Sequence, residues 1–109
     1  MKTAPGADSR RPTPARRKTK PRLLERDVMR LVRDYLGLRG WFVMRHQQGL
    51  GSIRGFPDLT ALKDGLTIYV ECKTPGGNLT ADQWTFRRSC ETYGGRYLVA
   101  RGIEDLEGL

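Results

Sequence analysis

The dipeptide Asp64-Gly65, between two runs of strand-forming residues, is the feature that most constrains how this chain can fold. The runs 58–63 and 66–73 are rich in aliphatic, β-branched and aromatic residues, and Asp-Gly between such runs is typical of a tight antiparallel hairpin. A two-residue turn also fixes the register, because Lys63 then faces Leu66 and each further step moves both strands by one residue. Asp58 is therefore predicted to lie opposite Glu71.

The remaining elements follow from apolar spacing and turn residues. The segment 23–38 repeats apolar residues with the spacing of one helical face, and Gly40 favours an end to that helix. Residues 41–46 have the composition of a strand, whereas 47–56 contain three glycines without any period and indicate a loop that is mobile or faces a ligand. A capping box at Thr80 and Gln83 predicts a helix to about Tyr93, followed by a strand over 96–100 and a short helix over 103–108.

This order of elements indicates an α/β fold. One helix, three strands, a second helix and a last strand give a mixed sheet of about four strands with flanking helices. The strand, helix and strand at the end favour a parallel pair joined by a right-handed crossover. With 109 residues the chain has enough material for one domain, which we place at 23–109.

The positive charge is concentrated at the N-terminus. The chain has 20 Lys and Arg against 12 Asp and Glu, for a net charge of +8. Residues 1–22 hold eight of the cations and one of the acids, so this segment carries +7 and the rest carries +1. The segment is also proline-rich and has few apolar residues, which predicts a disordered arm. Its cations suit contacts with nucleic-acid phosphates, although a solubilising tail is the alternative; the candidates are Arg10, Arg11, Arg16, Arg17, Lys18 and Lys20.

Several function classes have no support in the sequence. No run approaches the roughly 18 apolar residues of a membrane span, and the N-terminus lacks the apolar stretch of a secretory signal, so we expect a cytoplasmic protein. Cys72 and Cys90 have no metal-ligand spacing, which argues against a zinc site or a disulfide scaffold and favours two reduced thiols. The glycine-rich segment 49–55 lacks the Gly-Lys-Ser/Thr ending of a P-loop, so no nucleotide cofactor is expected.

The predicted hairpin brings acids together. Directly opposed residues have Cβ atoms about 4.5–5.5 Å apart, so Asp58 and Glu71 repel each other unless positive charge lies between them. Lys73 projects on the same face as Glu71, and Cys72 on the opposite face. Carboxylates without nearby His or Cys favour Mg²⁺ or Mn²⁺, and Lys73 would then stabilise charge on a phosphate during phosphodiester hydrolysis. The alternative is a set of surface ion pairs worth less than about 1 kcal/mol.

Two short motifs lie at 55–59 and 70–73. They are Gly-Phe-Pro-Asp-Leu and Val-Glu-Cys-Lys, and they are followed by Thr74-Pro75 and by the later Gln83. Together they resemble the PD-(D/E)XK nuclease signature. The similarity is to its VRR-NUC branch, the virus-type replication and repair nucleases, and covers about residues 24–105. It implies a restriction-endonuclease-like core and metal-dependent endonucleolytic cleavage of DNA. Stand-alone phage and bacterial members resemble homodimeric enzymes that resolve four-way (Holliday) junctions.

The resemblance assigns roles to individual residues. It implies that Asp58 and Glu71 bind the metal, that the backbone carbonyl of Cys72 adds a ligand, and that Lys73 is the catalytic lysine. It also places Glu25 near the metal as an outer ligand, and the helical spacing puts Glu25 on the rim of the core-facing side as a buried acid; capping of its own helix is the alternative. Gln83 is expected to point toward the sheet beside the site, with the capping box as the alternative.

Other residues carry weaker signals. His46 is the one histidine, and either touches DNA, acts as a base or is structural. Arg54 and the glycines around it are expected to approach a DNA phosphate. Trp84, Arg87 and Arg88 suit a dimer interface, a DNA backbone or an ordinary solvated face. Two other functions remain open: a non-catalytic nucleic-acid-binding module, and a monomeric nicking or flap nuclease.

Overall fold

The computed structural model describes residues 23–47 and 53–109, and it confirms the predicted order of elements. The chain is an α/β protein with a four-stranded mixed sheet, compatible with the expected core. The final element is a 3₁₀ helix, the strand at 96–100 has the predicted bounds, and the other three strands are slightly shorter than predicted. The elements are α1 (Glu25–Leu38), β3 (Phe42–Arg45), β4 (Leu59–Lys63), β5 (Leu66–Cys72), α2 (Ala81–Thr92), β6 (Arg96–Ala100) and η2 (Ile103–Leu106).

The hairpin between β4 and β5 has the predicted register. Lys63 pairs with Leu66 and Leu59 pairs with Val70, so one further step places Asp58 opposite Glu71. Asp64 and Gly65 both have positive φ, at 52° and 79°, as a twisted two-residue turn requires. Asp58 itself lies one residue before β4, where the paired strand has ended.

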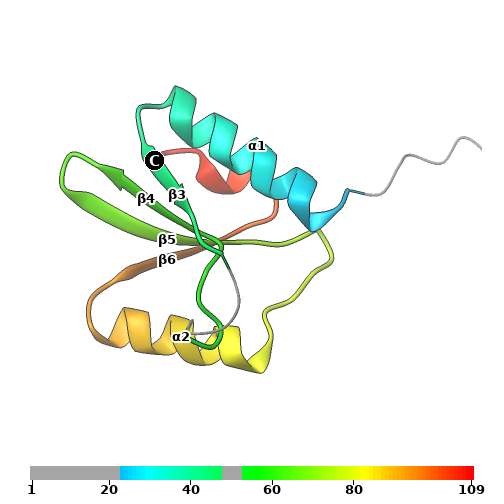
Figure 1. Cartoon of the computed structure of the whole chain (residues 1–109), viewed down its shortest axis with the longest axis vertical. Helices are drawn as coiled ribbons and strands as arrows, with labels where there is room; N and C mark the ends of the chain where they lie inside the picture. Colours follow the sequence, from blue (N-terminus) through cyan, green and yellow to red (C-terminus); the bar gives the residue numbers. More distant parts are fainter. Residues whose placement is uncertain (1–22, 48–52) are drawn as a thin grey trace, which may run out of the picture.

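The sheet has the order β3-β4-β5-β6, with antiparallel pairs followed by the parallel pair β5 and β6. Helix α2 connects the two parallel strands. It lies on one side of the sheet, whereas α1 and η2 lie on the other side (Figure 1). The structure therefore has three layers, and the first turns of both long helices reach toward the end of β5 that carries Glu71.

The two faces of the sheet are packed differently. On the α1 side, aliphatic residues form the core; they are Val28, Val32 and Leu36 of α1, Leu106 of η2, and Leu59, Ala61, Ile68, Val70, Cys72 and Ala100 of the sheet. On the other side the packing is aromatic. Phe56 and Tyr69 each contact Phe86 of α2 edge to face, at ring centroid distances of 5.3 and 5.7 Å. Such pairs favour one relative orientation of rings and so fix α2 over the sheet.

The N-termini of the two long helices are capped by identifiable side chains. At α2 the Thr80 hydroxyl accepts from the Gln83 amide and the Gln83 side chain accepts from the Thr80 amide, so the predicted capping box is confirmed. Helix α1 begins at Glu25 rather than at residue 23. There the Leu24 amide donates to Asp27 Oδ2 at 3.0 Å, so Asp27 supplies the capping carboxylate of α1.

Some predictions concern parts outside the described residues. The basic arm at 1–22, with all six of its candidate DNA-binding residues, lies there, and so does much of the glycine-rich loop. The arm and the domain boundary therefore stay predictions. Within 23–47 and 53–109, no helix combines the length and the apolar character needed to cross a membrane.

Candidate active site

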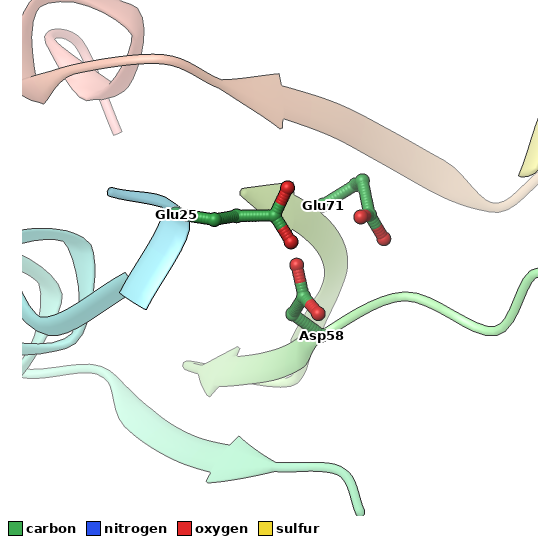
Figure 2. Close-up of side chains that lie close together, drawn as sticks. All are labelled: Glu25, Asp58 and Glu71. Atoms are coloured by element: carbon green, nitrogen blue, oxygen red, sulfur yellow. The ribbon is translucent and has the colours of Figure 1, made fainter. Parts of the chain in front are cut away.

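Three carboxylates from three separate parts of the chain meet at the end of β5. Glu25 comes from the first turn of α1, Asp58 precedes β4, and Glu71 is on β5. Each offers one oxygen, and these three oxygens all lie within 4.8 Å of one another. Figure 2 shows the three side chains extending from their separate backbones into one region. Like charges at this separation repel, so the arrangement requires protons or cations to offset it.

Glu71 is the most deeply buried of the three, with 1% of its surface exposed. Its Oε2 accepts a hydrogen bond from Gln83 Nε2 at 3.0 Å, whereas its Oε1 has no hydrogen-bond partner among the described residues. Burial, reinforced by the charge of Asp58, raises the pKa of Glu71 to about 8. The fold thus keeps an acid in an environment that disfavours its ionised form.

Asp58 is held in place by the backbone of the opposite strand. Its Oδ2 accepts a hydrogen bond from the Cys72 amide at 2.9 Å, and Asp58 is 9% exposed. The Asp58 carbonyl accepts from the His46 amide at 2.8 Å, which extends the pairing of β3 and β4 by one residue. Asp58 is therefore anchored on both sides, its carboxylate by the end of β5 and its backbone by the residue that follows β3.

Lys73 supplies positive charge to the cluster. Its Nζ lies 3.6 Å from Glu71 Oε2 and 3.9 Å from Glu25 Oε2, and the side chain is buried. In the described part of the chain, Lys73 makes the ion pairs of both Glu25 and Glu71, and Asp58 has no ion pair. One cation does not balance three ionised carboxylates, so a fully ionised cluster needs further positive charge.

Glu25 differs from its expected environment. The helical spacing placed it as a buried acid, but 49% of its side-chain surface is exposed. This prediction was wrong because α1 begins at Glu25, so no preceding helical turn covers it. Capping of the helix is the task of Asp27, and Glu25 instead extends to the cluster. The site is consequently open to solvent on the α1 side.

The side chain of Cys72 lies on the opposite face of β5 from Glu71, as predicted. Its side chain is fully buried in the aliphatic core, opposite to Glu71, and burial raises the pKa of its thiol to about 12. A thiol in this environment stays protonated and is a poor nucleophile or metal ligand. The proposed contribution of Cys72 through its backbone carbonyl stays a prediction.

Gln83 combines the two roles that sequence reasoning treated as alternatives. Its side-chain oxygen accepts from the Thr80 amide, and its side-chain nitrogen donates to Glu71 Oε2. The amide group is therefore fixed by the helix start at one end and orients the buried carboxylate at the other. A short motif, Thr-x-x-Gln, here serves both the cap and the site.

His46 lines a hollow beside the acids. Its Nε2 is hydrogen-bonded to Thr60 Oγ1 at 2.5 Å, and its ring packs against Phe56 at a centroid distance of 4.6 Å. Burial lowers the pKa of His46, although the carboxylate of Asp58 partly offsets this. The adjacent hollow has a volume of about 530 Å³ and is lined by Met29, Arg45, His46, Gln47 and Asp58. Sequence reasoning missed Met29 and Arg45 as neighbours of the site, because the packing of α1 against β3 brings them there.

The segment around Arg54 contacts the protein itself. Gly55 has a φ of +73°, and a Cβ at this position would lie 2.2 Å from the Asp82 carbonyl oxygen. We expected the glycines of this segment to allow a close approach to a DNA phosphate. Gly55 instead allows the backbone to approach the start of α2. Arg54 remains exposed, with its guanidinium 3.7 Å from the Asp82 carboxylate. Contact of Arg54 with DNA stays a prediction.

Comparisons with known proteins assign neither a family nor a function to this chain. The sequence matches no family model, and searches of curated proteins and of solved structures give no match. The roles of the site residues thus depend on their geometry and on the short motifs that carry the resemblance.

The raised pKa of Glu71 predicts an unusual pH dependence for the metal-free protein. Above a pH of about 4.5 the unfolded chain loses this proton, whereas the folded protein keeps it until the pH approaches 8. The stability contributed by the neutral carboxyl is thus fully present below about 4.5 and is lost between 4.5 and 8. In EDTA we expect the Tm to fall by several degrees from pH 5 to pH 8.

The measurement is a series of thermal unfolding curves of the wild type and of Glu71→Gln. The variant removes the titrating group and keeps an acceptor for Gln83, so its Tm should exceed that of the wild type increasingly toward pH 8. Subtracting the two series cancels the opposite contribution of His46, which disfavours folding at low pH. If the Tm of the wild type and that of Glu71→Gln changed by the same amount between pH 5 and pH 8, the assigned environment of Glu71 would be contradicted.

Proposed function

We propose that the chain is a Mg²⁺- or Mn²⁺-dependent endonuclease that hydrolyses DNA phosphodiester bonds. The observation that supports it most is the buried carboxylate of Glu71, with an unpartnered oxygen, beside Asp58 and Glu25. A structural ion pair would not need three acids around one lysine. The resemblance of the motifs at 55–59 and 70–73 to VRR-NUC nucleases supports the same activity.

The donor set fits a hard divalent cation. Asp58 and Glu71 would hold the ion, with Glu25 on the solvent side and the Cys72 carbonyl as a further oxygen donor. Oxygen ligands of this kind suit Mg²⁺ and Mn²⁺, and the sulfur of Cys72 points away. When bound, the ion acts as a Lewis acid that stabilises charge developing on the phosphate.

The protein's own groups prepare the site for this chemistry. The Cys72 amide fixes the direction of the Asp58 carboxylate, and Gln83 fixes that of Glu71. Lys73 has its ammonium group beside the acids, where it can donate hydrogen bonds to a water or to a phosphate oxygen as negative charge increases. Groups that are already oriented lose little free energy to reorganisation during the reaction.

The DNA would approach from the exposed side of Glu25 and across the hollow lined by Arg45 and His46. The basic arm would add sequence-independent contacts to phosphates. A homodimer that acts on branched DNA, such as a four-way junction, follows from the resemblance and belongs to this proposal, as does a cytoplasmic location in a bacterial or phage-infected cell.

A panel of labelled substrates tests the activity. Linear duplex, flap, four-way junction and single strand are incubated with Mg²⁺, with Mn²⁺ and with excess EDTA. We expect cleavage of at least one form with either metal and none in EDTA. Salt-sensitive binding without a metal-dependent product on any form would indicate the non-catalytic binding module instead. Sedimentation of the protein alone separates the homodimer from the monomeric nicking or flap nuclease.

A further inference from the structure

The outer side of α2 carries an exposed tryptophan next to the site. Trp84 follows Gln83, which is hydrogen-bonded to Glu71, and consecutive Cα atoms are about 3.8 Å apart. Trp84 is 51% exposed, in contrast to Trp41, which is 6% exposed in the core. Neighbouring residues of a helix point in different directions, so the indole lies on another side of α2 from the Gln83 side chain, and a strand that leaves the acid cluster has to run about 10 Å around the helix to reach it.

The surroundings of Trp84 are cationic. The Arg87 guanidinium lies 5.3 Å from the centroid of the Trp84 ring and 5.5 Å from that of the buried Tyr97. Packing against both rings holds Arg87 in one position, and Glu91 accepts from its Nε at 3.4 Å. Arg88, one turn from Trp84, is exposed and has no ion pair among the described residues.

A hollow lies beside the indole. It has a volume of about 370 Å³ and is lined by Trp84, Arg87, Arg88, Glu91 and Thr92. This size falls at the lower end of the roughly 300–1,000 Å³ typical of ligand pockets. An aromatic face with arginines at its edge is the combination that binds unpaired bases, because the base stacks on the ring and the phosphates contact the cations.

We infer that Trp84, Arg87 and Arg88 form a stacking platform for an unpaired nucleotide of the DNA substrate. The inference depends on the proposed nuclease function and refines it. A base inside a continuous duplex cannot stack on Trp84 without leaving its partner. The platform thus selects substrates with a single-stranded segment within a few nucleotides of the cleaved bond, such as a flap, a gap or an open junction.

Binding without metal tests the platform independently of cleavage. Oligothymidylate is titrated into the full chain in EDTA, and both tryptophan fluorescence and the anisotropy of a labelled oligothymidylate are recorded. We expect quenching of the Trp84 emission, since Trp41 is shielded in the core. Trp84→Ala should lower the affinity at least about fivefold, the lower limit for loss of one stacked base.

Matched variants separate stacking from general effects. Trp84→Phe keeps an aromatic face, so it should lose the quenching and retain the affinity within about threefold. Tyr93→Ala removes another aromatic residue, 90% exposed, just beyond the same helix, and should retain the affinity within about twofold. Circular dichroism of each variant confirms the fold.

Two results would overturn the platform. One is unchanged binding of oligothymidylate by Trp84→Ala, and the other is an equal loss of affinity for a blunt duplex. Either result leaves metal-dependent cleavage by the wild type intact. Conversely, stacking on Trp84 without cleavage of any DNA form would support the platform and contradict the nuclease.

Discussion

Asp58→Asn should abolish cleavage and leave the fold and DNA binding intact. The amide oxygen can still accept the hydrogen bond from the Cys72 amide, so the local structure is kept. The variant loses one negative charge of the acid cluster and with it a principal oxygen ligand. We expect the cleavage rate to fall by about 100-fold or more, as is typical when one preorganised electrostatic group is removed.

DNA binding provides the contrast for this variant. Loss of a carboxylate facing the substrate removes repulsion of the phosphates, so Asp58→Asn should bind DNA as tightly as the wild type or more tightly. Asp34→Asn is the matched control, because it makes the same chemical change on the exposed side of α1. Single-turnover rates and filter binding measure both effects. A rate within tenfold of the wild type would exclude Asp58 from the chemistry.

Lys73→Met should lose activity and also alter stability. The methionine keeps most of the buried volume but removes the cation that lies within 4 Å of two acids. The charge of Lys73 lowers the pKa of Glu71, so its removal raises that pKa further. Folding is then opposed more strongly as pH rises, and the Tm gap between variant and wild type should widen from pH 5 to pH 9.

The size of the effect follows from breaking a buried ion pair. At high pH, where Glu71 ionises in the wild type, we expect a loss of about 3 kcal/mol in the free energy of unfolding. Cleavage should fall by about 100-fold or more. Lys63→Met is the matched control, since the Lys63 ammonium donates to the Arg39 carbonyl and lies over the Trp41 ring at the far end of β4. A constant Tm gap would show that Lys73 acts only through packing.

Local patterns account for much of this fold. Asp64-Gly65 set the register of the hairpin because a two-residue turn leaves no freedom, and the register alone placed Asp58 opposite Glu71. Thr80 and Gln83 likewise marked the start of α2, because the capping box uses adjacent backbone groups. Each of these signals depends on residues that are near each other in sequence.

Features that depend on tertiary packing were not predictable. The exposure of Glu25 follows from where α1 begins relative to β5, which no local pattern specifies. The pairing of His46 with Thr60 depends on how β3 aligns with β4 across a long glycine-rich loop, and that loop does not fix a register. The approach of Gly55 to Asp82 needs the position of α2 over the sheet.

A calorimetric titration of the metal-free protein with Mn²⁺ tests the metal site most directly. It is run near pH 7.5 in two buffers with different ionisation enthalpies, so that protons released on binding are counted. Because burial holds the pKa of Glu71 near 8, metal binding must displace its proton. We expect saturable binding with proton release in the wild type and loss of both in Asp58→Asn. Absence of saturable binding, or equal binding by the variant, would contradict it.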